Sequence, residues 1–300
     1  MIRFAYPEKK LISFDLIAGG CANFNYKIHL EHQSQPLLLR VYLRDKTAAY
    51  REQKLAALIS KMVPVPLTYY IGEIEGYQYA ITEFMQGLSL RDLLLSKPSY
   101  DLSGIMYEVG MILSKIAAYE FPKAGFLNNK LEVVQNESSD IINFSKDCLN
   151  DKTILAALDP SMIAEITKSI EEHASLFHTD DDKHLVHGDY DPANIFVDKI
   201  NGTWVITGIL DWEFAFSGSY LWDVANILRY AHKMPPEFEN SFLDALQKNG
   251  LILPAYWRTT IDLLNLSSLV DLLKRSDLQN HPNRITDIRE LIERILSNSD

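Results

Sequence analysis

The sequence has only two cysteines, no long apolar run and no excess of basic residues. It therefore lacks the usual features of disulfide-rich extracellular, membrane-spanning and nucleic-acid-binding proteins. Its two cysteines, Cys21 and Cys148, lie too far apart for a metal-binding pair, so a reduced cytoplasmic protein is expected. No apolar run approaches the roughly 20 residues of a membrane helix, and Met1 to Pro7 lacks a signal-peptide core. The net charge of −11 argues against nucleic acid as a partner, because nucleic-acid phosphates require a basic surface.

What the chain does contain is an ordinary globular composition. Apolar residues make up 47% of the chain and charged residues 23%. Its length of 300 residues is enough for one large or two modest domains. We find no internal repeat and no low-complexity tail. The acidic balance permits a cationic partner, although solubility explains it equally well.

One polar stretch between two apolar runs carries the strongest chemical signal. The segment His187–Asn194 reads H-x-D-x-x-x-x-N and lies between the apolar runs Leu185–Val186 and Ile195–Val197. A further strand pattern, Thr203–Leu210, leads directly to Asp211. This layout brings two carboxylates and one amide oxygen to the same place. A magnesium-bound triphosphate requires such groups, and the spacing is that of a kinase catalytic loop followed by its metal-binding Asp.

Each polar residue of this stretch has a predicted role. Asp189 is expected to accept or orient the acceptor hydroxyl, and Asn194 and Asp211 are expected to hold Mg²⁺. Asp191 precedes a proline and is expected to form a turn. The alternative is a surface turn rich in Asp, Asn and Pro between two strands.

The run H-G-D-x-x-x-x-N-I-F-V-D, followed by I-L-D-W-E, resembles the aminoglycoside phosphotransferase and choline kinase family. The resemblance implies ATP- and Mg²⁺-dependent phosphorylation of a small-molecule hydroxyl. It also implies an α+β, two-lobed, protein-kinase-like fold, with a small antiparallel-sheet lobe at 1–86 and a larger, mainly helical lobe at 87–300. By the same resemblance His187 braces the catalytic loop, and Asp223 caps and ties it.

The first lobe shows the alternation of β-strands. Five strands are predicted: Leu11–Ala18, Phe24–Leu30, Leu37–Leu43, Leu67–Gly72 and Tyr77–Thr82.

The turn between the first two predicted strands contains two glycines, Gly19 and Gly20. Without side chains, their backbone N–H groups can approach phosphate oxygens. The motif G-G-C-A-N is a poor match to a dinucleotide fingerprint and is equally typical of a hairpin turn. The family resemblance implies that Gly20 and Asn23 lie near the nucleotide phosphates.

Arg40 stands where a kinase carries the Lys that holds the nucleotide phosphates. Arginine is not equivalent to lysine, because it is planar, larger and always charged. In the resembled family an Arg does occur at this place, so activity is expected. A nucleotide-binding protein without transfer activity remains the alternative.

A helix is predicted over Thr47–Ser60, with Glu52 on its apolar side and with Arg51 and Lys54 pointing outward. A carboxylate on a buried face requires a cation, and Arg40 on the neighbouring strand is available. We therefore predict an ion pair between them, unless Glu52 lies at the solvated border of the face.

The segment after the fifth strand resembles a kinase hinge. There the Glu83 carbonyl and the Met85 N–H would pair with adenine. Backbone contacts leave almost no sequence signature, so these two assignments depend on the resemblance alone.

The second lobe is predicted to be mostly helical. Ser89 begins a helix with Asp92 as its capping box, and further helices are predicted at Leu102–Tyr119, Ser139–Leu149, Pro160–Phe177, Glu237–Lys248, Tyr256–Lys274 and Ile285–Leu296. The run Asp180–Asp182, with His173, His178 and His184 nearby, is interpreted as a solvated loop rather than a metal cluster.

The acceptor itself cannot be read from one sequence. The candidates to contact it are Trp212, Glu213, Tyr220 and Asp262, although core packing or surface exposure explains each equally well.

Overall fold

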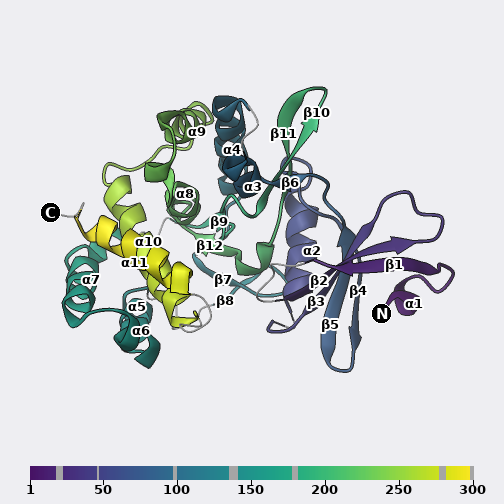
Figure 1. The fold of residues 1–300 in the computed structure, drawn as a ribbon, viewed down its shortest axis with the longest axis horizontal. Coiled ribbons are helices and arrows are strands. Elements are labelled where there is room, and N and C mark those ends of the chain that lie inside the picture. The colour runs from purple at the N-terminus through teal and green to yellow at the C-terminus, as the bar shows by residue number, and fades with distance from the viewer. Residues whose placement is uncertain are drawn as a thin grey trace.

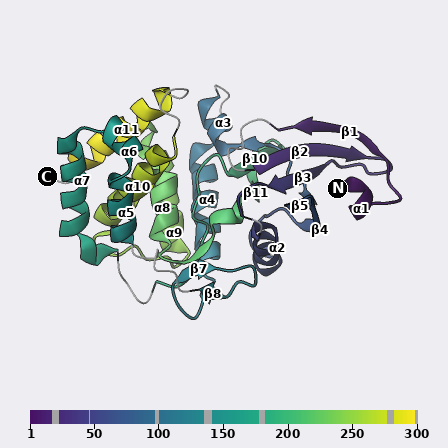
Figure 2. The ribbon, with the colours of Figure 1, turned by 90° about the horizontal axis from the view of Figure 1, so that it is seen from below.

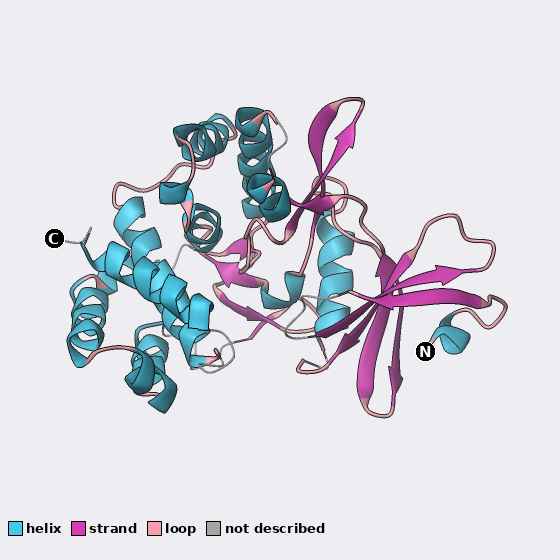
Figure 3. Ribbon diagram, in the orientation of Figure 1, coloured by secondary structure: helices cyan, strands magenta, loops and turns pink. Residues whose placement is uncertain are grey.

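The chain folds into a sheet lobe and a helical lobe (Figures 1 and 3). The computed structural model describes residues 1–17, 23–45, 47–96, 100–134, 141–177, 182–276 and 282–297. The N-terminus lies on the sheet lobe and the C-terminus at the far end of the helical lobe (Figure 1). The predicted α+β, protein-kinase-like fold class is confirmed.

The small lobe is built on one antiparallel sheet with the strand order β1-β2-β3-β5-β4. Its strands are β1 (Leu11–Leu16), β2 (Asn23–Leu30), β3 (Leu37–Tyr42), β4 (Thr68–Ile74) and β5 (Tyr77–Glu83). All five agree with the predicted strands to within a few residues. The short helix α1 (Ile2–Ala5) was not predicted. It packs against the apolar side chains on the face of the sheet opposite α2.

Helix α2 (Ala48–Ile59) lies between the sheet and the helical lobe (Figure 2). Leu55 and Ile59 join the core of the helical lobe, while Ala48 packs with Ala80 of the sheet. The prediction that Arg51 points outward is wrong. Arg51 is only 8% exposed, because the helix is covered on two sides rather than one.

The large lobe is mainly helical. Its helices are α3 (Leu90–Leu95), α4 (Leu102–Ala117), α5 (Ile141–Leu149), α6 (Lys152–Ala157), α7 (Pro160–Glu172), α8 (Leu221–Leu228), α9 (Pro236–Lys248), α10 (Trp257–Lys274) and α11 (Pro282–Ser297). Short 3₁₀ turns are η2 (Ala174–Leu176), η3 (Trp212–Phe214) and η4 (Ala231–Lys233). Ser89 caps α3 as predicted, with its Oγ accepting the Asp92 N–H at 3.0 Å. Helices α6 and α8 were missed.

Short strands frame the loops of the large lobe. They are β6 (Leu88–Ser89), β7 (Gly125–Leu127), β8 (Val133–Val134), β9 (His184–Val186), β10 (Ile195–Ile200), β11 (Thr203–Ile209) and β12 (Phe216–Gly218). The hairpin β10–β11 and the β9–β12 pair enclose the segment 187–194 and the residues that follow Ile209. The fold thus holds both halves of the predicted catalytic motif between paired strands.

No helix in the described part of the chain is long and apolar enough to cross a membrane.

Candidate functional site

Asp223 at the start of α8 fixes the backbone of the predicted catalytic loop. Its two carboxylate oxygens accept the N–H groups of His187 and Gly188 at 2.8 and 2.9 Å, and the side chain is fully buried. Burial raises the pKa of Asp223 to about 7, although these two hydrogen bonds oppose the shift. Gly188 has φ +82°, and a Cβ there would lie 2.5 Å from the Phe214 carbonyl oxygen, so the middle position of H-G-D requires glycine.

His187 braces the loop as a neutral ring. Its Nδ1 accepts the Asp189 N–H at 3.2 Å, so Nε2 carries the proton and donates to the Leu210 carbonyl at 2.9 Å. Burial lowers the pKa of His187 to about 4. The ring therefore joins the catalytic loop to the end of the strand before Asp211. Because both of its nitrogens are hydrogen-bonded to the backbone, it does not act as a base.

Asp189 and Asn194 contact each other directly. Asn194 Nδ2 donates to Asp189 Oδ2 at 2.8 Å and to the Asp189 carbonyl at 2.9 Å. Burial raises the pKa of Asp189 to about 6, with further contributions from the charges of Asp191 and Asp211. Asp191 is the turn former that the sequence predicted, since its Oδ1 accepts the Ala193 N–H at 2.8 Å.

Arg40 on β3 links the two lobes. Its Nη2 lies 2.7 Å from Asp211 Oδ1 and 3.2 Å from Glu213 Oε2. The predicted pair with Glu52 is confirmed, with 3.6 Å between Nη1 and Oε1, but it is the longest of the three. Burial by itself would lower the pKa of Arg40, yet Glu52 and Asp211 outweigh it and the pKa is raised.

Glu52 is held by a tyrosine as well as by Arg40. Tyr42 donates its hydroxyl to Glu52 Oε2 at 2.6 Å. Burial raises the pKa of Glu52, while Arg40 and this hydrogen bond lower it. Because β3 carries both Arg40 and Tyr42 on the face toward α2, one strand orients the whole pair.

Glu213 belongs with Glu52 and Asp211 to the cluster of acids around Arg40, and the sequence did not predict this place for it. It was a candidate to contact the acceptor, but it lies against Arg40 and accepts the Asn23 Nδ2–H at 2.8 Å. Arg51, also missed, donates to the Glu213 carbonyl at 2.7 Å and pairs with Asp45 at 2.8 Å. The order D-x-E after an apolar strand could have indicated this contact, since the 3₁₀ turn η3 places both acids beside Arg40.

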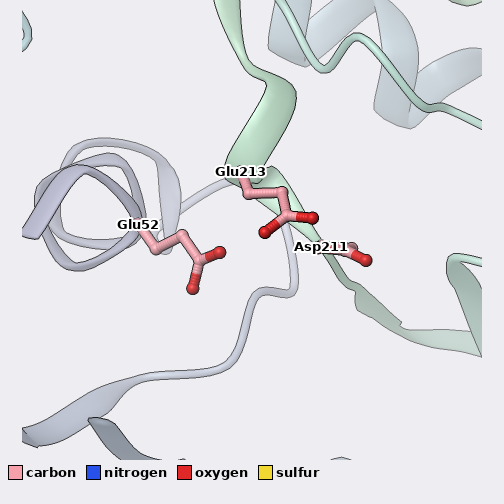
Figure 4. A group of neighbouring side chains, drawn as sticks. All are labelled: Glu52, Asp211 and Glu213. Atoms are coloured by element: carbon pink, nitrogen blue, oxygen red, sulfur yellow. The ribbon is translucent and has the colours of Figure 1, made fainter. Parts of the chain in front are cut away.

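The three acids of the cluster offer oxygens that fit a cation. One oxygen from each of Glu52, Asp211 and Glu213 lies within 4.8 Å of the other two (Figure 4). All three carboxylates lie within 4 Å of the Arg40 guanidinium. A divalent cation with hard-oxygen preference matches this donor set.

Asn194 lies beside this group. The Leu210 N–H donates to the Asn194 carbonyl at 2.8 Å, so the loop and the strand end before Asp211 are joined at this point. Asn194 uses Nδ2 for its hydrogen bonds, which keeps Oδ1 available as a ligand. Asp211 has φ 67° and ψ 59°, a left-handed conformation that Asp tolerates better than most residues and that recurs at functional sites.

The predicted hinge residues are near but not within this cluster. Thr82 donates its hydroxyl to the Glu83 carbonyl at 3.2 Å, and the Glu83 N–H pairs with Leu67. The Met85 side chain reaches β11, where a Cβ at Gly208 would lie 3.0 Å from the Met85 methyl carbon. Gly20 lies outside the described residues.

The other three acceptor candidates have different surroundings. Trp212 is only 4% exposed, donates to the Ile209 carbonyl at 3.0 Å and packs on the His187 ring, so it belongs to the core. Tyr220 donates to the Ile252 carbonyl at 2.6 Å and lines a hollow of about 240 Å³. Asp262 lies on α10, where burial raises its pKa and the charges of Arg294 and Arg258 lower it.

Comparison with known proteins identifies the family. A family model described as a phosphotransferase enzyme family matches residues 13–260. The chain belongs to this family. Among characterised relatives, homoserine kinase of Mesorhizobium japonicum is 26% identical over 262 residues, which cover 84% of this chain and 73% of the relative.

A second relative, hygromycin-B 4-O-kinase of Escherichia coli, is 28% identical over 176 residues. This match covers 56% of the chain and about half of the relative, 48% of its length.

Solved structures of aminoglycoside phosphotransferases have the same fold. A thermostable mutant of aminoglycoside phosphotransferase APH(4)-Ia, in complex with AMP-PNP and hygromycin B, superimposes with a TM-score of 0.75 at 20% identity. That match covers 99% of this chain and 96% of the other. A GDP and kanamycin complex of APH(2")-IIia gives 0.75 at 17% identity, covering 100% and 98%.

Proposed function

We propose that this chain is an ATP-dependent phosphotransferase that transfers the γ-phosphoryl group to a hydroxyl group of a small molecule. One observation carries the proposal. The fold brings Asp189, Asn194 and Asp211 into one connected group beside the buried cation Arg40. Phosphoryl transfer requires a residue that orients the acceptor hydroxyl, ligands for the metal ion, and a positive charge that contacts the phosphates.

The residues have the following roles in this proposal. Asp189 orients the acceptor hydroxyl and accepts its proton, since the loose transition state requires mainly positioning and late proton acceptance. Asn194 Oδ1 and Asp211 hold Mg²⁺, which neutralises charge on the phosphate oxygens when bound. Arg40 steadies the phosphates, and Glu52 holds Arg40.

The nucleotide occupies the space between the lobe of residues 1–86 and the lobe of residues 87–300. The Glu83 carbonyl and the Met85 N–H would hold adenine, and Asn23 would hold the phosphates; the family resemblance implies the same role for Gly20, which lies outside the described residues. The complexes of similar solved structures with AMP-PNP and with GDP support a purine nucleotide as the phosphoryl donor.

A protein that binds a nucleotide without transferring phosphate was the alternative. The Arg40 contacts count against it, because the arginine reaches Glu52 and Asp211 from the strand where the usual Lys would stand. We therefore favour an active enzyme, and the two widely separated cysteines favour a cytoplasmic location. The net charge of −11 favours a positively charged group on the acceptor.

An ATP-consumption screen tests the proposal. The acceptors are aminoglycosides, amino alcohols, hydroxy amino acids, sugars and nucleosides, each offered with ATP or GTP and Mg²⁺. The Asp189→Asn variant serves as the blank. Acceptor-dependent ADP formation by the wild type, absent in the blank, is expected; no such ADP with any acceptor class would overturn the proposal.

A further inference from the structure

Arg51 on α2 joins the small lobe to the turn that follows Asp211. Its Nη2 donates to the Glu213 carbonyl oxygen at 2.7 Å and to Asp45 Oδ2 at 2.8 Å. Asp45 precedes α2 in the small lobe, whereas Glu213 belongs to η3 in the helical lobe. One nitrogen atom of Arg51 thus binds both lobes, across 162 positions of sequence from Glu213.

The burial of Arg51 is explained by these two bonds and not by packing. The side chain is buried, and its Nε has no acceptor among the described residues. A buried donor without a partner costs free energy, which an apolar side chain of similar length would avoid. Hydrogen bonds in which the donor is charged are among the strongest in proteins, and Nη2 makes two of them.

Asp45 fixes the direction of the Arg51 side chain. Its Oδ1 accepts the N–H and the hydroxyl of Thr47, each at 2.8 Å, so the carboxylate is attached to the residue before α2 begins. Its Oδ2 faces Arg51. The guanidinium is therefore oriented toward η3 by groups of the small lobe alone.

The turn at Asp211 is held from both lobes. On one side, the Leu210 N–H donates to the Asn194 carbonyl at 2.8 Å, which ties the chain to the catalytic loop. On the other side, Arg51 holds the carbonyl of Glu213. Asp211 lies between these contacts in a left-handed conformation, with φ 67°. Such a conformation persists in a non-glycine residue only where the surroundings enforce it.

Arg51 positions the acids of the turn without binding their carboxylates. The Glu213 carboxylate accepts from Asn23 and Arg40, while Arg51 takes only the Glu213 main-chain oxygen. Arg40 Nη2 also lies 2.7 Å from Asp211 Oδ1. Because Arg51 occupies no carboxylate oxygen, both acids keep their side chains for Arg40 and for a cation.

We infer that Arg51 is a positioning residue for the metal site. It holds the backbone of η3 so that Asp211 and Glu213 present their carboxylates together, beside Glu52 (Figure 4). The inference rests on the proposed phosphotransferase function, in which Asp211 binds Mg²⁺. Arg51 acts through the turn and contacts no reacting group. It also makes the metal site depend on the position of α2 in the small lobe.

The first test measures metal binding by two substitutions at Arg51. Arg51→Met removes both hydrogen bonds and keeps the apolar stem. Arg51→Lys keeps the charge but lacks the planar guanidinium, so its effect should be intermediate. Mn²⁺, which accepts the same oxygen ligands as Mg²⁺, is titrated in the presence of AMP-PNP and followed by electron paramagnetic resonance.

The expected loss is specific to the metal. Arg51→Met should weaken Mn²⁺ binding by about 10- to 100-fold, the range for losing hydrogen bonds to a charged group. Binding of ADP in the presence of EDTA should stay within a few-fold of the wild type, because it involves no metal. In turnover assays with an acceptor from the screen, the KM for Mg²⁺ should rise while the KM for the acceptor stays unchanged.

A second readout needs neither metal nor turnover. Amide hydrogen exchange of a peptide covering residues 211–216 reports the order of the turn, in which the Ala215 N–H donates to the Trp212 carbonyl at 3.1 Å. Exchange should be faster in Arg51→Met than in the wild type. It should return toward the wild-type rate in Arg51→Lys.

Two further variants control for charge and for folding. Lys54→Met is the matched control, because Lys54 is exposed on the same helix and the change removes the same charge. Asp45→Asn can still cap the Thr47 N–H but loses its charge toward Arg51, so it should give a smaller loss in the same direction. If a melting curve shows that Arg51→Met does not fold, Arg51→Lys and Asp45→Asn carry the test.

Three results would overturn the inference. One is unchanged Mn²⁺ affinity in folded Arg51→Met. Another is an equal loss of Mn²⁺ and of metal-free ADP binding, which would make Arg51 a general structural residue. The third is the same loss of Mn²⁺ affinity in Lys54→Met, which would assign the effect to net charge. A wild type that binds no Mn²⁺ with AMP-PNP would refute the proposed function as well, whereas normal metal binding in every variant would refute this inference alone.

Discussion

Replacing Asp189 by Asn removes the charge of the predicted base and keeps its shape. Asn194 Nδ2 donates to Asp189 Oδ2 at 2.8 Å, and the amide oxygen of an Asn at this position can accept the same bond. The Asn194 contact to the carbonyl of residue 189, at 2.9 Å, does not involve the side chain at all. The loop should therefore keep its conformation.

The expected loss of turnover follows from the role of the base. General base catalysis is typically worth about 10²–10⁴ in rate, which corresponds to about 3–5 kcal/mol of barrier. We expect Asp189→Asn to lower kcat by that factor and to change ATP affinity by no more than a few-fold. Because Asp189 is buried near the like charges of Asp191 and Asp211, its removal should also raise the melting temperature.

Steady-state kinetics with an acceptor found in the screen measures the first effect, and calorimetry with AMP-PNP and Mg²⁺ measures the second. Asp191→Asn is the matched control, because it removes a carboxylate two residues away that only accepts the Ala193 N–H. It should leave turnover within a few-fold of the wild type.

Two outcomes would refute this reasoning. Full turnover in Asp189→Asn would show that no base is needed at this position. Crippled turnover in Asp191→Asn, with normal turnover in Asp189→Asn, would show that the catalytic loop is assigned to the wrong residues.

Three further predictions concern the metal, the ion-pair cluster and pH. Asp211→Ala should abolish Mg²⁺-dependent ATP binding while the fold survives; unchanged affinity by calorimetry would refute its role as a metal ligand. Removal of Glu52 leaves Arg40 its closer contacts to Asp211 and Glu213, so the cost should lie at the lower end of the roughly 1–3 kcal/mol expected for a buried cation that loses a partner. We now expect a coupling energy near 1 kcal/mol in an Arg40–Glu52 double-mutant cycle on urea unfolding, and a value of zero would contradict the pair. Because the folded-state pKa of Asp223 is raised to about 7 from its ordinary 3.8, its contribution to stability is present below pH 4 and is lost as pH rises to 7. Asp223→Asn removes this dependence, so the mutation should cost most near pH 4 and less toward pH 7, by on the order of a few kcal/mol; a cost that grows with pH in melting experiments would show that the buried carboxyl is ionised throughout.

Local residue patterns were sufficient to predict the helices, the strands and the catalytic motif. The alternation of apolar residues set the five strands of the small lobe, and the apolar periodicity and caps set the long helices α4, α9 and α10. The loop spacing from His187 to Asn194 required only that two strands flank it, and β9 and β10 do so. Even the Arg40–Glu52 pair followed from helix phase, because one buried charge requires another.

Two kinds of feature depend on how whole elements pack: helices that are buried on two sides, and contacts between residues far apart in the sequence. Arg51 has the local pattern of an exposed residue, and it is buried because α2 packs between two lobes. Glu213 meets Arg40 and Asn23, which are 173 and 190 residues away in sequence, because the two lobes close on each other. The hydrogen bond from Arg229 to Asn265 could not be predicted, since the two residues are 36 positions apart and meet only because α8 packs against α10. Long-range pairing depends on the packing of whole elements, and a single sequence read segment by segment does not contain it.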